Sequence, residues 1–174
     1  MDLQIEITAD NPAWASAVPD AAAISERAAR AALAEVRTRA PAALGEAGAC
    51  ELGITLTDDR HIAALNRDWR GQDRPTNVLS FPIGEACEAG GPAPRLLGDV
   101  VVALETLLAE AAAEAKTPPA HLSHLIVHGV LHLLGYDHEV TAEAEAMEAL
   151  ERDVLARLGI ADPYREQEAA ETGR

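Results

Sequence analysis

Cysteine is scarce in this sequence: its 174 residues contain only Cys50 and Cys87. Two cysteines cannot assemble a cysteine-based zinc site, and so few thiols suit a reducing compartment better than a disulfide-rich secreted domain. Cys50 alternates in phase with Leu52, Ile54 and Leu56, which predicts a small apolar side chain in the core. Cys87 lies in a segment rich in glycine and proline, and a disulfide between the two cysteines is not expected.

Long apolar runs are missing as well. No uninterrupted apolar segment approaches the ~20 residues that a membrane span requires. The first six residues contain neither a basic region nor a long apolar stretch, so no signal peptide is predicted. We therefore expect a cytoplasmic protein that does not associate with a membrane.

Basic residues are outnumbered by acidic ones. Fourteen Lys and Arg against 29 Asp and Glu give a formal net charge of −15 and a pI near 4.6. This charge favours solubility and argues against non-specific binding of polyanions. A hydrophobic content of 48% is typical of a globular protein, and 174 residues most simply form one domain.

The hydrophobic pattern predicts an α+β fold: one domain over residues 1–161, in which about five helices pack on a four-stranded mixed sheet. Period-two alternation and short apolar runs predict the strands, over residues 3–8, 50–57, 77–83 and 98–104. Apolar positions at helical spacing predict the helices, over residues 20–36, 58–70, 105–116, 118–134 and 141–158. Residues 84–94 are predicted to form a mobile surface loop, and residues 162–174 a polar, flexible tail.

The second predicted helix carries arginines at its end. Its apolar positions Ile62, Leu65 and Trp69 are expected to face the core, and Gly71 is expected to end it. Arg70 lies in the last turn, where a cation complements the helix dipole or binds a phosphate through its guanidinium fork. Arg67 and Arg74 have the spacing to share its side, although Asp68 and Asp73 nearly cancel the local charge.

Two histidines lie four residues apart in the apolar helix predicted after residue 118. On a helix, His128 and His132 differ by roughly 40° around the axis and about 6 Å along it, so both imidazoles can reach one metal ion. Gly135 stands where a helix commonly ends in a left-handed residue, and the chain can double back there to bring up His138. Three such nitrogens leave a fourth tetrahedral position for water, as in catalytic zinc sites.

A structural role is the alternative for these histidines, since a single buried histidine is usually a hydrogen-bonded core residue. Three at this spacing around a glycine turn favour one bound metal ion. We predict Zn²⁺, which tolerates three imidazoles and an open position, although nickel and copper also bind such ligands.

Other polar residues surround the predicted ligands. His124 and His121 precede them on the helix, as partly buried positions or as donors that orient a ligand imidazole. Asp137 either orients a histidine or bonds to the local backbone of a turn.

Metalloproteases offer an alternative function, because His-Glu-x-x-His followed by Gly and a third His has the same spacing. Their general base is the glutamate after the first histidine, and here Gly129 occupies that position. The metal ligands are therefore present without the peptidase base.

Four segments share their motifs and their order with one known family. They are Leu65-Asn66, residues 69–82 (WRGQDRPTNVLSFP), residues 97–101 (LGDVV) and residues 128–138 (HGVLHLLGYDH). In these segments, which span about half the chain, the sequence resembles the YbeY family of bacterial metallo-endoribonucleases. Asn77 stands where many members have Asp, so no role is assigned to it.

The resemblance implies a zinc-dependent single-strand endoribonuclease that acts in maturation of the 3′ end of small-subunit (16S) ribosomal RNA and in ribosome quality control. It implies His128, His132 and His138 as metal ligands, with His128 and Arg70 essential for catalysis. It also implies association with the small ribosomal subunit and with the GTPase Era, and no DNA substrate is expected.

The acidity conflicts with an RNA substrate, because a chain at −15 should bind naked RNA weakly and with strong salt dependence. A locally positive cleft or delivery by ribosomal partners would resolve the conflict. A non-catalytic ribosome-assembly factor with a structural zinc is a further alternative.

Overall fold

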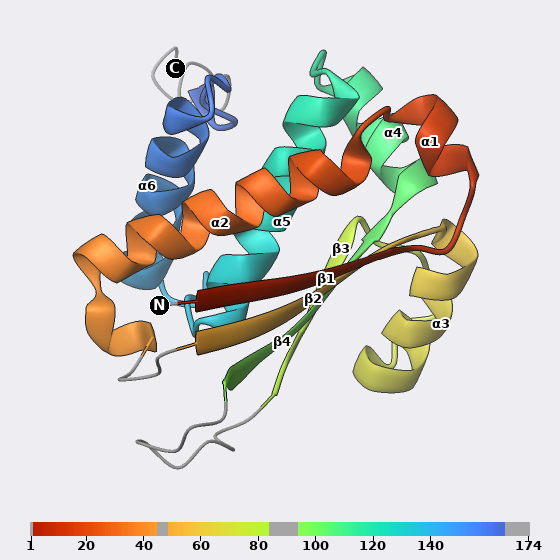
Figure 1. Cartoon of the computed structure of the whole chain (residues 1–174). Coiled ribbons are helices and arrows are strands. Elements are labelled where there is room, and N and C mark those ends of the chain that lie inside the picture. Colours follow the sequence, from red (N-terminus) through yellow and green to blue (C-terminus); the bar gives the residue numbers. More distant parts are fainter. Residues whose placement is uncertain (1, 45–48, 84–93, 166–174) are drawn as a thin grey trace.

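Four strands form one mixed sheet in the order β1-β2-β4-β3 (Figure 1). They are β1 (Asp2–Ala9), β2 (Ala49–Thr57), β3 (Val78–Pro82) and β4 (Arg95–Ala103). β1, β2 and β4 run parallel, whereas β3 pairs antiparallel with β4 and forms an edge of the sheet. The predicted four-stranded mixed sheet is confirmed.

The computed structural model describes residues 2–44, 49–83 and 94–165. Cys87 and nearly all of the predicted loop over residues 84–94 lie outside these described ranges, as does the tail beyond Arg165. Within the described ranges, no helix is both long and apolar enough to cross a membrane.

Helices cover both faces of the sheet (Figure 1). They are α1 (Ala13–Ala17), α2 (Ala21–Arg39), α3 (Asp59–Arg70), α4 (Leu104–Ala113), α5 (Pro118–Leu133) and α6 (Thr141–Arg157), with a 3₁₀ turn at Pro41–Leu44. Successive residues of a strand face opposite ways. In β4, Val100 and Val102 belong to the main core with α2, α5 and α6, whereas Val101 and Ala103 pack against α3. The two faces therefore have separate cores.

The described residues form six α-helices, where the sequence predicts about five. The additional one is α1, whose five residues are too few to show a helical period. Its Trp14 is buried, and the indole Nε1 donates a hydrogen bond to the backbone oxygen of Thr57 at 2.9 Å. This helix therefore depends on tertiary packing more than on its own propensity.

β4 begins at Arg95, three residues before the predicted start. The register between β2 and β4 shifts between Glu51 and Leu52, which leaves Leu97 without a partner on β2. Gly98 follows with φ +124, and a Cβ there would lie 2.2 Å from the backbone oxygen of Phe81. The strand thus continues through an irregularity that the glycine permits.

The predicted ends of α3 are confirmed, but the predicted burial of Trp69 is wrong. Asp58 caps the helix by accepting a hydrogen bond from the backbone N–H of His61, and Gly71 ends it with φ +69. Trp69 is 72% exposed. The buried residues of α3 are Ile62 and Asn66. The side-chain amide of Asn66 donates a hydrogen bond to the backbone oxygen of Arg74 at 2.9 Å.

Candidate metal centre

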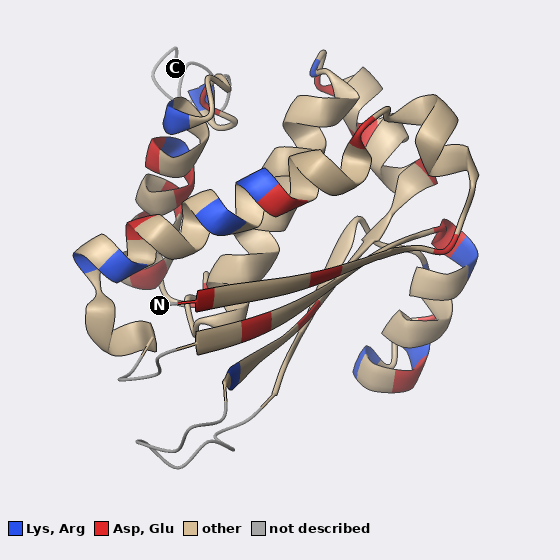
Figure 2. Ribbon diagram, viewed as in Figure 1, with Lys and Arg blue, Asp and Glu red and all other residues tan. Residues whose placement is uncertain are grey.

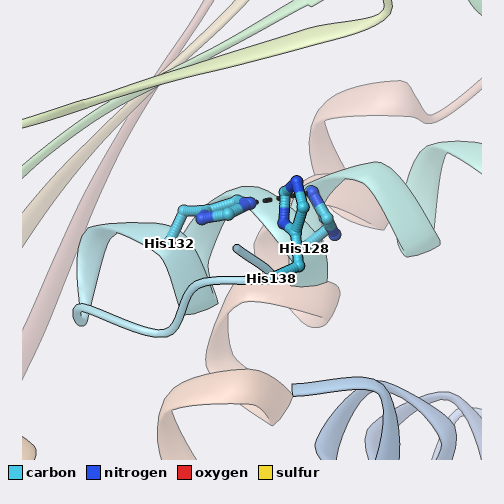
Figure 3. Close-up of side chains that lie close together, drawn as sticks. All are labelled: His128, His132 and His138. Atoms are coloured by element: carbon cyan, nitrogen blue, oxygen red, sulfur yellow. Dashed lines mark hydrogen bonds between the residues drawn. The ribbon is translucent and has the colours of Figure 1, made fainter. Parts of the chain in front are cut away.

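Three imidazole rings meet at the C-terminal end of α5 (Figure 3). His128 and His132 lie one turn apart on α5, and Gly135 follows with φ +89, so the chain reverses and brings His138 up to them. One ring nitrogen from each residue lies within 4.8 Å of the other two. The structure therefore brings together all three residues that the sequence predicts as ligands.

The tautomer of His128 suits a metal ligand. Its Nδ1 lies 2.6 Å from Oε1 of Glu151. An ionised carboxylate can only accept a hydrogen bond, so Nδ1 carries the proton and Nε2 keeps its lone pair. That Nε2 faces Nε2 of His132 at 3.0 Å.

The spacing of these nitrogens fits one small cation. Two imidazole ligands at 2.0–2.1 Å from a tetrahedral ion lie about 3.3 Å apart. The 3.0 Å between the Nε2 atoms of His128 and His132 needs only a small ring rotation to match. Burial, followed by the neighbouring His128 and His138, lowers the pKa of His132, which favours the neutral form that a metal requires.

The centre is open to solvent on one side. His128 and His132 are half-buried, whereas the side chain of His138 is 60% exposed. A hollow of about 190 Å³ adjoins His128 and is lined in part by Lys116, His121 and Tyr164. Of the three clustered histidines, His128 alone lines this hollow, so the open side of the cluster is the exposed face of His138.

Glu151 of α6 is a functional residue that the sequence analysis missed. It is fully buried and contacts two histidines of α5, His128 at 2.6 Å and His124 at 3.7 Å. The hydroxyl of Tyr164 donates a hydrogen bond to its second oxygen. Burial alone would raise the pKa of Glu151, but the interactions with the two histidines lower it to about 2. The carboxylate is therefore ionised and orients His128.

A weak signal for Glu151 exists in the sequence. Met147, Leu150 and Val154 form the buried face of α6, and Glu151 falls on that face rather than on the solvent side. A charged residue among buried positions requires a partner. The sequence does not identify that partner, because α5 and α6 meet only in the folded chain.

The histidines upstream take different roles. His124 lies between His128 and Tyr164, with ring centroids 6.3 and 5.8 Å away, and so belongs to the Glu151 network. His121 instead bonds Glu110 of α4 at 2.7 Å through its Nε2. Neither belongs to the group formed by His128, His132 and His138.

Asp137 bonds to the local backbone. Its Oδ1 accepts a hydrogen bond from the N–H of His138 at 2.7 Å and lies 3.9 Å from Nδ1 of the same histidine. The carboxylate therefore shapes the turn that presents His138.

Gly129 packs directly against the sheet. A Cβ there would lie 2.7 Å from Cγ1 of Val100 and 3.1 Å from the hydroxyl oxygen of Ser80, which itself donates to the backbone oxygen of Gly129. The metalloprotease glutamate has no room at this position. The close approach of α5 to the sheet also explains a glycine inside a helix.

We expect Gly129→Ala to destabilise the protein. Overpacking against Val100 costs about 1–3 kcal/mol, and the gain in helix propensity offsets only about 1 kcal/mol. Urea unfolding should show a lower midpoint with an unchanged slope. A variant more stable than the parent would mean that Val100 and Ser80 move aside freely.

Arg70 lies away from the three histidines in the fold. It is the last residue of α3, on the face of the sheet opposite α5, and its side chain is exposed. Arg67 pairs with Asp68 at 2.9 Å, and Arg74 bonds the side-chain oxygen of Gln72. Within the described ranges, Arg70 has no hydrogen bond or ion pair, so its guanidinium is available for a ligand.

The chain is similar to a named family over most of its length. A family model described as Endoribonuclease YbeY matches residues 17–159. The Endoribonuclease YbeY of Azorhizobium caulinodans is 54% identical over 162 residues, which cover 93% of this chain and 96% of the relative. That of Paramagnetospirillum magneticum is 52% identical over 171 residues, which cover 96% of this chain and 100% of the relative.

One solved structure shows the same fold. The solution structure of the Thermotoga maritima protein TM1509 matches with a TM-score of 0.55 and 22% identity, and covers 98% of this chain and 96% of its own. At this identity the likeness concerns the fold alone.

Proposed function

Because this chain belongs to the YbeY family of endoribonucleases, we propose that it is a metal-dependent endoribonuclease that hydrolyses phosphodiester bonds in single-stranded ribosomal RNA. The observation that carries the proposal is the group of three imidazole nitrogens with an open side, in a chain of this family. Water activated by a metal ion would not need a carboxylate base at position 129, so Gly129 is compatible with a hydrolase.

The proposed ligands are His128, His132 and His138, and the proposed ion is a single Zn²⁺. A zinc ion held by these residues would supply a water of lowered pKa, about 7, and a Lewis acid for the phosphate. The chain itself keeps His132 neutral and fixes the ring of His128 through Glu151. His138, the most exposed of the three, borders the side from which RNA would approach.

Arg70 is proposed as the catalytically important arginine, through its hold on a phosphate. A guanidinium without an internal partner can bind a phosphate in bidentate fashion. The edge strand β3 lies between Arg70 and α5. On one face of β3, Ser80 contacts Gly129 of α5. On the other face, Phe81 contacts Trp69, the neighbour of Arg70 in the chain. A single strand of RNA that passes this edge would reach both faces.

The resemblance supports the finer details of the proposal. They are maturation of the 3′ end of 16S ribosomal RNA, ribosome quality control, association with the small subunit and with the GTPase Era, and a cytoplasmic location. Ribosomal partners would deliver RNA to a protein whose net charge is −15.

The alternatives gain no specific support. Gly129 leaves no room for a protease base. The exposure of His138 at the edge of the cluster argues against a purely structural zinc.

Chelation separates these functions. We expect the purified protein to cut unstructured RNA, to lose that activity in chelator and to recover it with added zinc, because hydrolysis needs the ion. Denatured casein should remain intact throughout, and structured RNA should be cut more slowly. Gel analysis of both substrates measures the outcome. Cleavage of casein in place of RNA would overturn the proposal.

Arg70→Ala tests the role of the arginine. This variant should cleave RNA more slowly than the parent while its zinc content stays unchanged.

A further inference from the structure

Trp69 presents a large apolar surface to solvent. Among the described residues, four large hydrophobic side chains are exposed, and Trp69, at 72%, is exposed the most. The chain has only two tryptophans, and the other, Trp14, is buried. An exposed indole on a soluble domain is typical of a binding surface.

The indole is supported from one side. Trp69 lies in the last turn of α3, just before the helix ends at Gly71. Its ring meets Phe81 of β3 edge to face, with centroids 5.9 Å apart and an interplanar angle of 63°. This contact restrains the ring, while its high exposure leaves surface free for a flat ligand.

The surroundings of Trp69 carry a small excess of positive charge. Near the end of α3, residues 67–74 contain three arginines and two aspartates, in a chain with a net charge of −15. Figure 2 shows arginines at the end of α3 where Trp69 lies. The guanidinium of Arg67 is paired with Asp68, whereas that of Arg70 has no internal partner in the described part of the chain. An anion is therefore favoured beside the indole.

We propose that Trp69 is a stacking platform for one base of the single-stranded RNA and that Arg70 binds a phosphate next to that base. The inference rests on the proposed function and adds a binding site to it. An aromatic face beside cationic side chains is how proteins hold single-stranded nucleic acid without reading its sequence. A duplex, whose bases are already stacked, would not use the platform.

The platform and the metal centre lie on opposite sides of one edge strand. Ser80 of β3 contacts Gly129 of α5, and the adjacent Phe81 contacts Trp69. RNA anchored at Trp69 therefore crosses β3 to reach the histidines. Trp69 would therefore determine which nucleotides of the bound strand reach the histidines. Its replacement should change the affinity for RNA and leave metal binding unchanged.

Tryptophan fluorescence tests the platform directly. The full-length protein is titrated with an unstructured RNA 12-mer in chelator, which prevents cleavage, and circular dichroism confirms that the fold persists. Stacking should quench the emission of Trp69, while buried Trp14 provides a constant background. The variants at position 69 lack this reporter, so their affinities are measured by the anisotropy of a fluorescently labelled RNA of the same sequence. Trp69→Phe should keep most of the affinity, whereas Trp69→Leu should weaken binding about 10- to 100-fold. The apolar but non-aromatic leucine separates stacking from simple hydrophobic contact.

Two further variants sharpen the test. Leu96→Ala removes another exposed apolar side chain, from β4, and should bind RNA as the parent does. Arg70→Ala should reduce the slope of log affinity against log salt by about 0.7, the value for one phosphate contact on a single strand.

Equal affinities for Trp69→Leu and the parent, or RNA binding without quenching, would overturn the inference. The surface would then belong to a protein partner. Cleavage by the parent, measured separately with zinc, would leave the proposed function standing in that case. Absence of any RNA cleavage by the parent would instead contradict the proposed function, whatever the fluorescence shows.

Discussion

Replacing His132 with alanine is expected to abolish both metal binding and RNA cleavage. Nε2 of His132 lies 3.0 Å from Nε2 of His128, so its loss leaves two ligands where three converge. A catalytic metal contributes several kcal/mol to transition-state stabilisation, and each 1.36 kcal/mol is tenfold in rate. We expect cleavage to fall by at least about three decades, measured by single-turnover assays alongside zinc content by elemental analysis.

The matched control is another histidine outside the cluster. His61 of α3 is about half exposed and contacts Thr57 and Asp10, so His61→Ala should keep full zinc content and full activity. Circular dichroism should show both variants folded. Full zinc content in His132→Ala would falsify the assignment of this residue as a ligand. Full activity without zinc would remove the metal from the mechanism.

Local sequence patterns predicted the clustering of His128, His132 and His138 because its geometry is mostly local. His128 and His132 share one face of a single helix, and the φ of +89 at Gly135 permits the reversal that brings His138 back. These relations hold within eleven residues of chain and need no knowledge of the rest of the fold. The same is true of the end of α3 at Gly71.

Contacts between distant elements were not predictable in the same way. Helical period placed Trp69 in the core, but it is 72% exposed, and the buried polar residue of α3 is Asn66, which bonds the backbone oxygen of Arg74. Glu151 reaches His128 across 23 positions of the chain, through the packing of α6 on α5. The five residues of α1 are held by the buried Trp14 and not by a pattern. In each case a tertiary contact overrides the local signal.

The position of Arg70 bears on how an acidic protein holds RNA. The arginines near the end of α3 lie on the sheet face opposite the histidines, and the guanidinium of Arg70 is not paired with the aspartates among them in the described part of the chain. Under the proposed function, RNA that binds Arg70 would turn past the edge strand β3 to reach the histidines. A preference for single strands would then follow from the placement of the two surfaces.

Replacing Glu151 with glutamine is expected to weaken metal binding about 10- to 100-fold, the usual effect of losing a partner that orients a ligand. The amide keeps the shape of the side chain but removes the negative charge that accepts from Nδ1 of His128 and from the hydroxyl of Tyr164. Competition against a zinc-binding dye measures the affinity. Raised zinc should restore cleavage in Glu151→Gln but not in His132→Ala, because only the latter lacks a ligand.

Two comparisons separate this orienting role from a structural one. Glu145→Gln makes the same change at an exposed position of α6 and should leave zinc affinity unchanged.

The pH dependence of stability is the second comparison. In the folded protein the pKa of Glu151 is about 2, below its ordinary value of 4.5. Its carboxylate therefore stabilises the metal-free fold fully above about pH 4.5, and this stabilisation is lost as the pH falls toward 2. The stability difference between parent and Glu151→Gln should shrink over that range. Lower stability with unchanged zinc affinity would show that Glu151 supports the fold without orienting His128.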